Sequence, residues 1–404
     1  MGHASIRRLS IVVDDFEDIY YDFGSFGIHV GPPEKIKTIL EDLQTGTIRR
    51  VELGDKPIIA YFTGHSPIVS ARAPFGRVAA THRASHGMGG PRGVSINNMV
   101  QTDLEFLPPK TFDRAIDSLM PVLRFLEVIA GRRQNLLLIE LELDLPKDRP
   151  DLGYFEVYWS APPSRSTATR TRRPHPGDLP LNGGMQPEEF GNVMGRWLTV
   201  DHERRDARQQ FSEGFSNGER YSAERLVSSA NMFDILPANA APKNVDLSQE
   251  LQAASAAATK LFKALSSTIE RDSILNALGR LGTANLKRKV QYRAKRLLDA
   301  VPERFPDLIL VLDEAINCRN HYVHGASAKI NYRSHFPDTV IFFIDTLEFV
   351  FAASDLIDAG WDIKPWLERP TSMTHPFGSF RVSYADRLQT LKALLKGKRD
   401  RRSS

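Results

Sequence analysis

The hydrophobic pattern of the chain changes along its length, and its N-terminal part is typical of β-strands. The clearest strand is expected at 135–145, where Ile139 and Leu141 belong to an apolar row that alternates with Glu140 and Glu142. A period of two places the two rows on opposite faces, so one face of this strand is predicted to be solvated. Shorter runs of β-branched and aromatic residues predict further strands at 58–64, 94–106 and 154–159.

A helical pattern precedes the strand at 135–145. The segment 111–131 follows Pro108 and Pro109 and is predicted to form a helix with a kink at Pro121. A later segment, 161–184, has five prolines and no periodicity, so we expect a mobile loop there. The basic residues of this loop are Arg165, Arg170, Arg172 and Arg173, and short basic runs in polar loops are usually solvated.

Helical periodicity begins again at Pro187 and replaces the strand signals beyond Phe215. Asp246 is expected to cap one of these helices in a capping box with Gln249. The helices after Phe215 are expected at 221–236, 246–271, 272–281, 284–301, 306–322 and 340–359. These patterns predict an α+β protein with a β-rich domain at 1–215 and an all-helical domain at 216–404, since 404 residues exceed what one core usually serves.

Composition and charge narrow the class of protein. The chain has 41% hydrophobic and 25% charged residues, which excludes a wholly disordered or coiled-coil chain. Its 53 Lys and Arg against 49 Asp and Glu leave a net charge of +4, so any nucleic-acid site must be local. The single cysteine, Cys318, cannot form an intramolecular disulfide, and the N-terminus lacks a secretory signal pattern. We therefore expect a cytoplasmic protein.

The most apolar segment, 340–357, is about long enough to span a bilayer but carries Asp345, Glu348 and Asp355. Each carboxylate would cost roughly 3 kcal/mol at the centre of a membrane, so we expect a buried helix and no membrane contact. Residues 341–351 leave hardly any polar face. Because one small bundle is not expected to bury them all, the segment predicts at least a homodimer through the C-terminal half.

Candidate chemistry is concentrated at 305–325. Apolar residues recur at intervals of three and four over 308–315, so this helix face must pack against protein. Polar residues then replace the apolar ones, namely Arg319, Asn320 and His324. Asn320 and His324 lie one helical turn apart on one face, and Arg319 lies about 100° away with a side chain long enough to lean over.

These three side chains suit chemistry at a phosphate. A guanidinium binds phosphate oxygens in a bidentate manner, a histidine moves a proton near neutral pH, and an amide orients either group. RNA supplies its own nucleophile, the 2′-hydroxyl, so its cleavage needs a base, an acid and charge stabilisation but no metal or cofactor. A second interpretation stays open, in which Arg319 and His324 cap the helix C-terminus and Gly325 ends the helix.

The sequence RNHYVH at 319–324 resembles the R-x4-6-H motif of HEPN domains, in which a polar residue commonly follows the arginine. The resemblance covers roughly 216–367. It implies an all-α bundle whose protomers pair to form one composite RNase site. His324 is then the general base or acid, Arg319 stabilises the phosphorane, and Asn320 positions the substrate.

The architecture of the whole chain supports a second resemblance. A β-rich region, the segment YSAERLV and a HEPN-like domain follow one another, and this order resembles the ApeA-like proteins of bacterial antiphage defence. The segment FDRAIDSLMPVLRFLEVIAG contributes to the likeness. The resemblance implies tRNA or another structured RNA as the target, abortive antiphage defence as the purpose and a phage-derived trigger.

A row of basic residues on 284–301 is a candidate RNA surface. Lys289, Arg293 and Arg296 follow one another at four-then-three spacing, with Tyr292 among them. Phosphates attract such charges and unstacked bases attract aromatic faces, although an ordinary solvated helix face explains the same row. Within the motif, His321 and Tyr322 are predicted to contact RNA, and Cys318 is expected to be a small buried residue rather than a nucleophile.

Two N-terminal features do not predict a site. His82 and His86 are four residues apart, but they lie among glycines and no Cys or carboxylate completes the set, so no metal is expected. The glycines at 87–93 predict a hairpin turn, because no Lys-Ser/Thr follows as in a phosphate loop.

The sequence therefore predicts a metal-independent HEPN endoribonuclease without a cofactor. Its β-rich domain is expected to sense the trigger or to restrain the nuclease domain. The alternative is a non-catalytic HEPN module that binds nucleotide or RNA, or holds a dimer, while the N-terminal domain recognises a ligand.

Overall fold

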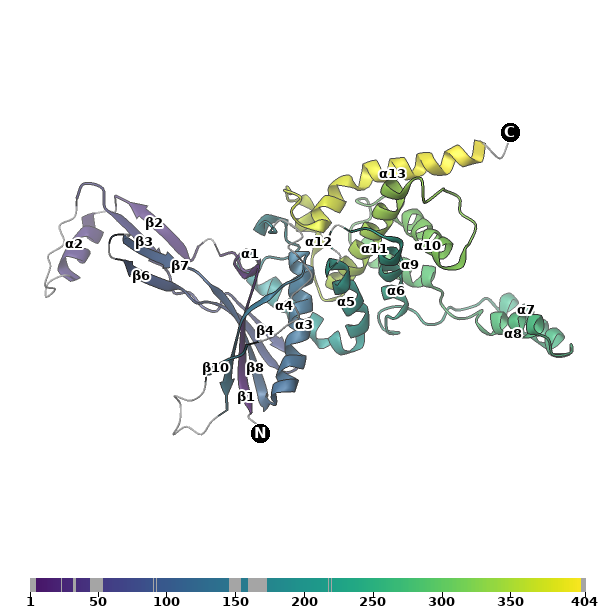
Figure 1. Ribbon diagram of the computed structural model, residues 1–404, viewed down its shortest axis with the longest axis horizontal. Coiled ribbons are helices and arrows are strands. Elements are labelled where there is room, and N and C mark those ends of the chain that lie inside the picture. The colour runs from purple at the N-terminus through teal and green to yellow at the C-terminus, as the bar shows by residue number, and fades with distance from the viewer. Residues whose placement is uncertain are drawn as a thin grey trace. The chain divides into compact units, whose positions relative to one another are not determined.

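The computed structural model of the chain describes residues 5–22, 24–31, 34–43, 54–89, 91, 93–144, 154–158, 173–216, 218 and 220–400. The chain forms two compact units, which cover mainly the residues up to Leu198 and mainly those from Thr199 onward (Figure 1). The ten strands lie in the first unit, and the described part of the second unit is helical. With 52% helix and 18% strand, the predicted α+β class is confirmed.

The boundary between the units lies before helix α5, which spans Asp201–Ser216. Helix α5 packs on helix α6, Ala223–Asp234, within the second unit. The boundary expected after residue 215 from the loss of strand signals therefore lies at the other end of α5.

A six-stranded sheet forms the centre of the first unit, in the order β10-β9-β1-β8-β5-β4. Each neighbouring pair is antiparallel. The predicted alternation in β9 is confirmed, because Ile139 and Leu141 are buried while Glu140 and Glu142 bind Arg83 and Arg8. The bounds are β1 Ile6–Val13, β4 Val69–Ala73, β5 Gly76–His82, β8 Val100–Lys110, β9 Leu136–Leu143 and β10 Tyr154–Glu156.

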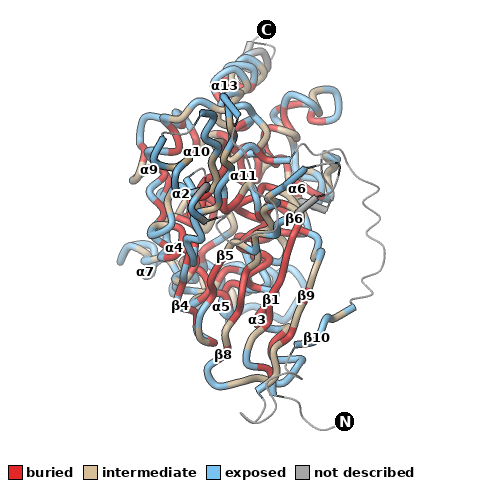
Figure 2. The backbone as a smooth tube through the Cα atoms, turned by 90° about the vertical axis from the view of Figure 1, so that its left-hand side faces the viewer, coloured by how far each residue is buried: buried red, intermediate tan, exposed pale blue. Residues whose placement is uncertain are grey.

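Helices α3, Phe112–Ala130, and α4, Pro187–Thr199, supply the aromatic part of this core. The ring of Phe125 on α3 lies 5.5 Å from both Phe190 and Trp197 on α4, and all three are fully buried. Helix α3 also contacts β1 and β8. Figure 2 shows the buried residues concentrated along β1 and the neighbouring strands.

Two glycines let α4 approach the edge strand β4. A Cβ atom on Gly191 would lie 2.6 Å from the carbonyl oxygen of Ser70, and one on Gly195 would lie 2.7 Å from that of Arg72. These residues are one helical turn apart, so the same face of α4 covers β4 along its length. The helix thereby protects an edge that would otherwise be open to pairing with another chain.

Two smaller antiparallel pairs complete the described strands, namely β2–β3 and β6–β7. The hairpin expected around the glycines at 87–93 is confirmed by the register Ser85↔Asn97 to Gly89↔Gly93. The single strand expected at 94–106 is wrong, because it divides into β7 and β8 at Asn98 and Met99. The bounds are β2 Phe26–Val30, β3 Ile58–Phe62, β6 Ser85–Gly89 and β7 Gly93–Asn97. Helix α1, Phe16–Ile19, contacts α3 and β8, and helix α2 spans Glu34–Leu43.

The second unit is built around helix α11, Phe336–Asp358. This helix contacts α6, α9, α10 and α13. Phe342, Phe343 and Phe349 are fully buried within the unit. The remaining helices are α7 Gln249–Lys263, α8 Ile269–Gly279, α9 Leu286–Ala300, α10 Leu308–His324, α12 Ile363–Glu368 and α13 Pro376–Asp400.

The burial of α11 corrects one sequence argument. Its bulky residues were expected to exceed the capacity of one small bundle and to require a second copy. A single chain buries most of them nonetheless, because α11 packs against α6, α9, α10 and α13. The described residues contain no helix with an apolar stretch that could span a bilayer.

Four acidic side chains of α11, which we call the α11 carboxylates, pair with groups on other helices. Arg204 and Arg208 of α5 bind Asp355 with N–O distances of 2.5 and 2.8 Å. Arg225 of α6 binds Glu348 through two nitrogens. The α11 carboxylates are Asp345, which binds Tyr221 and Arg387, Glu348, Asp355, and Asp358, which binds Arg204 and Arg293.

Helices α7 and α8 have no buried residue. They pack on each other, and a short bridge between Asn244 and Thr283 joins the two ends of the segment. The expected capping box is wrong, because Ser248 and not Asp246 caps α7, with its hydroxyl accepting the amide of Leu251 at 3.2 Å. A serine two residues closer to the helix therefore takes this role.

The Asp355 contacts lead to a stability prediction. Asp355→Ala should lower the free energy of unfolding by about 3–5 kcal/mol, because it leaves two buried guanidinium groups without the carboxylate that they share. The matched control is Asp338→Ala on the same helix, whose side chain is 52% exposed and should cost little. Chemical denaturation of both variants is the measurement, and equal losses would contradict the prediction.

The Asp355 carboxylate also predicts how the stability of the fold changes at acidic pH. Burial by itself raises the pKa of Asp355, but the guanidinium groups of Arg208 and Arg204 outweigh this effect and hold the pKa well below its usual range. A lowered folded-state pKa stabilises the fold above the unfolded pKa of about 4, and the contribution is lost as the pH falls below that value. Unfolding of the wild type should thus depend more steeply on pH below about 4 than unfolding of Asp355→Asn.

Candidate active site

The predicted site lies at the C-terminal end of helix α10. Leu308, Val311 and Ala315 form its buried row, which continues to Cys318. Burial decreases beyond this point, since Arg319 and Asn320 are half-buried and His324 is exposed. The residues of the motif 319–324 therefore lie where the packed face of the helix reaches the surface.

The guanidinium of Arg319 brings four side chains together. Its Nη1 donates to Asn320 Oδ1 and to His324 Nε2, both at 3.1 Å. Its Nη2 donates to Oδ1 of Asn231 on α6 at 3.0 Å. Its Nε is buried and has no hydrogen-bond partner in the described part of the chain. Arg319 thus lies within hydrogen-bond distance of both the Asn320 amide and the His324 imidazole, the groups predicted to converge with it on this helix.

The helix end is closed by the main chain rather than by Arg319. Gly325 has a φ of +65°, and its amide donates to the carbonyl of His321 at 3.0 Å. The His321 ring bonds the carbonyl of Ala326 at 2.9 Å. A glycine in the left-handed region is the usual end of a helix. Capping thus belongs to Gly325 and His321, while the hydrogen bonds of Arg319 go to side chains.

This arrangement can place a positive charge and a proton carrier at one point. Arginine has no lone pair to accept a hydrogen bond, so His324 Nε2 must be the acceptor in its contact with Nη1. The Nε2 atom therefore presents its lone pair to Arg319, and it can receive a proton once this hydrogen bond is released. The guanidinium keeps its charge next to it and can bind phosphate oxygens.

Comparison with known families agrees with this geometry. The family Apea-like HEPN matches residues 227–364, which include α6, α10 and the motif 319–324. The family ApeA N-terminal domain 1 matches residues 59–197. The chain belongs to the ApeA-like HEPN proteins. No curated protein and no solved structure matches it.

This membership carries a general functional statement. HEPN domains are generally nucleases, and the two family matches support a role in HEPN-type antiphage defence. The N-terminal match covers most of the six-stranded sheet, and the HEPN match covers the bundle around α11. The two resemblances identified from the sequence are thus confirmed at the level of the family.

Aromatic side chains surround the end of the motif in the HEPN domain. The His321 ring lies 5.5 Å from the rings of both Tyr322 and Tyr332. Tyr322 is 37% exposed, so its face is open to a ligand, whereas Tyr332 is buried. Burial, and after it the Glu314 carboxylate, raises the pKa of the Cys318 thiol to about 12. Cys318 is therefore a buried residue as expected, and at neutral pH it is not a thiolate.

The predicted basic row on α9 does not form one RNA-facing surface. Arg293 is only 1% exposed, and its guanidinium binds Ser354, Asp358 and the carbonyl of Ala240. Its assignment as an RNA contact is therefore corrected: the side chain faces the interior and pairs with α11. The four-then-three spacing identifies a helix face, but it does not tell whether that face points to solvent or to another helix.

The other two members of the row have protein partners as well. Lys289 binds the carboxylate of Asp234 at 2.7 Å and the carbonyl of the same residue at 2.8 Å. Arg296 lies over the ring of Tyr292, with its side chain 47% exposed. Arg296 is thus open to a ligand, whereas Lys289 holds the last turn of α6.

Asn231 was missed by the sequence analysis. It lies in the segment that follows YSAERLV and has no special spacing relative to Arg319, from which 88 residues separate it. A polar residue on an otherwise buried stretch of α6, between Ala230 and Met232, is the signal that it offers. Only the packing of α6 on α10 shows its partner.

In the N-terminal unit, His82 belongs to a small polar cluster in which its Nε2 lies 3.5 Å from Oδ2 of Asp22. His82 has a side chain that is only 1% exposed, and its ring bonds Asn98 at 3.0 Å and lies edge-on to Phe26 and Phe62. It is a core residue. No group of three His, Cys, Asp or Glu in the described part of the chain is placed to hold a metal ion.

Of the four arginines in the proline-rich loop, the structure describes Arg173. Arg173 binds the carbonyl of Asp14 at 2.8 Å and lies 3.3 Å from the carboxylate of Asp18. This contact joins it to protein rather than to a phosphate. Arg165, Arg170 and Arg172 lie outside the described residues.

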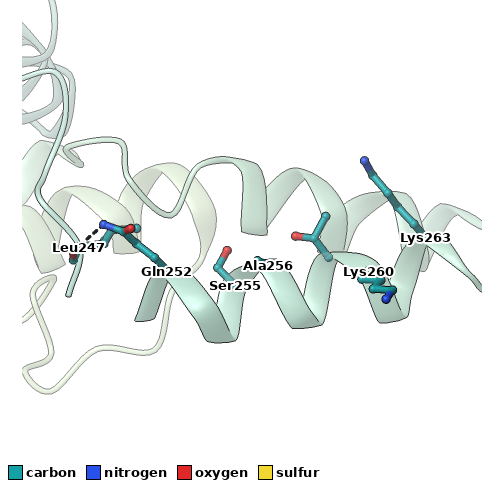
Figure 3. A pocket seen from close by; sticks show the side chains of 7 residues that line it. Leu247, Gln252, Ser255, Ala256, Lys260 and Lys263 are labelled. Atoms are coloured by element: carbon teal, nitrogen blue, oxygen red, sulfur yellow. Dashed lines mark hydrogen bonds between the residues drawn. The ribbon is translucent and has the colours of Figure 1, made fainter. Parts of the chain in front are cut away.

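An open groove follows helix α7 (Figure 3). Small side chains such as Ser255 and Ala256 line it, together with Lys260 and Lys263. Gln252 bonds the carbonyl of Leu247 at one end. The groove shares no residue with the motif 319–324, and it contains no pair of groups that could transfer a proton.

The burial of Arg293 leads to a prediction. Arg293→Gln should lower the free energy of unfolding by about 3–5 kcal/mol, because it leaves Asp358 with an incomplete set of partners inside the bundle. Arg288→Gln on the same helix is the matched control and should change it by about 0.5 kcal/mol or less, since that residue is exposed. Urea denaturation of the two variants separates them, and equal stabilities would contradict the assignment of Arg293 to the core.

Proposed function

We propose that the HEPN domain is an endoribonuclease and that Arg319 and His324 carry the reaction. The observation that supports this proposal is the direct contact between the Arg319 guanidinium and the His324 imidazole at the surface end of α10. Phosphoryl transfer needs both groups at one phosphate.

The reaction uses the 2′-hydroxyl of the RNA as its nucleophile. His324 releases its hydrogen bond to Arg319 Nη1, and its Nε2 then accepts the proton of the 2′-hydroxyl while the oxygen attacks the adjacent phosphorus. The bond from phosphorus to the 5′-oxygen breaks, and the leaving oxygen takes a proton from a general acid. The products carry a 2′,3′-cyclic phosphate and a 5′-hydroxyl. Arg319 stabilises the charge on the phosphorane and Asn320 positions the substrate, so the reaction requires no metal ion.

The need for both a base and an acid favours a site made by two copies of the chain. Within one protomer, His321 is held by the carbonyl of Ala326, which leaves His324 as the exposed imidazole of the motif. Two facing protomers would supply two such imidazoles. Val323 within the motif is 43% exposed, and Ile235, one turn after Asn231 at the end of α6, is 47% exposed. We propose that these residues form the contact between the copies.

The biological setting follows from the family. We propose that the target is tRNA or another structured RNA in the cytoplasm, that cleavage serves abortive antiphage defence, and that the N-terminal domain senses a phage-derived trigger. Tyr322 and Arg296 are then the exposed candidates for contacts with RNA, since their side chains are 37% and 47% exposed.

Replacement of the two central residues tests the activity. His324→Ala should lower the rate of RNA cleavage by about 10²–10⁴-fold, because it removes the proton carrier. Arg319→Ala should be comparably damaging, and Arg319→Lys should restore only part of the rate because an ammonium lacks the bidentate fork. The measurement is cleavage of cellular RNA in EDTA, with the ends of the products determined.

The controls separate catalysis from folding. His202→Ala removes an imidazole on α5 with a side chain that is 71% exposed, and it should leave the rate unchanged. Rates are normalised to folded protein. Full activity of His324→Ala, or loss of wild-type activity in EDTA, would overturn the metal-free mechanism and favour a module that only binds nucleotide or RNA.

A second test concerns the dimer. Val323→Glu should convert the protein to a monomer and abolish cleavage, because a charge would be buried at the contact beside the motif. Val382→Glu on α13 is the matched control, since this valine is 54% exposed and lies on another helix. Light scattering measures the mass of each variant. A wild-type chain that is monomeric at micromolar concentration would contradict the composite site.

A further inference from the structure

Asn231 is in contact with the proposed catalytic arginine from a different helix. Its Oδ1 accepts the Nη2 proton of Arg319 at 3.0 Å, while the two contacts within α10 both involve Nη1. Bonds at Nη1 alone would leave the flat guanidinium free to rotate about them. The additional bond at Nη2 fixes the plane of the group, which decides where its remaining donors point.

The helix that carries Asn231 is itself firmly placed. Arg225 on α6 binds Glu348 of α11 with N–O distances of 2.9 and 2.8 Å, and Phe233 lies edge-on to Phe351. Lys289 of α9 bonds the last turn of α6 through the carbonyl and the carboxylate of Asp234. A side chain that must orient another group is best placed on such a rigid element.

The side chain at position 231 is an uncharged amide, and this lack of charge matters for Arg319. A carboxylate at this position would form an ion pair with Arg319 and compete with a phosphate for the guanidinium. The nearest acidic residue on the same helix face is Asp234, one turn after Asn231, and its carboxylate is taken by Lys289 at 2.7 Å. The protein thus gives Arg319 an uncharged acceptor and pairs the neighbouring negative charge elsewhere.

We propose that Asn231 is a positioning residue that holds the Arg319 guanidinium in its phosphate-binding orientation without reducing its charge. The proposal rests on the endoribonuclease function above. It adds a residue from helix α6 to the three site residues on α10. It also gives Lys289 a role as the residue that keeps the Asp234 carboxylate away from Arg319.

Two substitutions at this position separate orientation from charge. Asn231→Ala removes the acceptor and should lower the single-turnover cleavage rate at saturating RNA by about 10- to 100-fold, since small misplacements of catalytic groups are costly. Asn231→Asp keeps the shape and the hydrogen bond but adds a negative charge. It should also remain slow, and it should bind less tightly an uncleavable RNA that carries 2′-deoxyribose at the cleavage position.

A residue with a merely structural role behaves differently. In that case Asn231→Asp, which is nearly isosteric and forms a stronger bond to Arg319, would restore both the rate and the stability. The matched control is Asn317→Ala on α10, whose amide bonds Glu314 at 3.2 Å, and it should leave the single-turnover rate within two-fold of the wild type. A wild-type rate in Asn231→Ala, or full rescue by Asn231→Asp, overturns the proposal.

Failure of the proposed function is recognised separately. A wild-type protein that cleaves no RNA contradicts the endoribonuclease itself. A double-mutant cycle on unfolding still measures the contact, because the effects of Asn231→Ala and Arg319→Ala on the unfolding equilibrium should be non-additive when one residue holds the other. Additive effects show that Asn231 does not hold Arg319 and overturn the positioning role whatever the activity.

Discussion

The pairing of buried charges on helix α11 is the constraint on which the rest of the HEPN domain depends. A carboxylate inside an apolar bundle is unstable unless a cation or several donors reach it. Each of the α11 carboxylates therefore fixes at least one neighbouring helix. Glu348 holds α6 through Arg225, and Asp355 holds α5 through Arg204 and Arg208. Because these contacts have defined geometry, the helices can pack around α11 in only a few ways.

The proposed active site is a consequence of this packing. The contact between Arg225 and Glu348 sets the position of α6, and one side of α6 then presents Asn231 to α10. Helix α10 buries its apolar row against the same bundle and ends at Gly325, where its polar residues reach the surface. The site is thus assembled from a charged network that holds the helices and a helix end that exposes the reactive groups. Disruption of the network would change the site without touching the motif.

Arg293 shows why a basic helix row is ambiguous. Lys289, Arg293 and Arg296 have the same spacing as a row that binds phosphates, yet one of them is fully buried and another holds α6. An arginine can satisfy a buried carboxylate as well as a phosphate, since both are anions with paired oxygens. Which of these anions it meets depends on the helix that packs against it, and this information is not local in the chain.

The sequence alone determined the strand-like and helical halves, the burial of the 340–357 segment as a helix, and the convergence of Arg319, Asn320 and His324. These features depend on periodicity and on spacing within one element, which are local properties. Tertiary structure alone decided that α11 is enclosed by its own chain, that Arg293 points inward and that Asn231 meets Arg319. These contacts join residues tens of positions apart, so their partners are set by how the helices pack and by which buried charges must be neutralised.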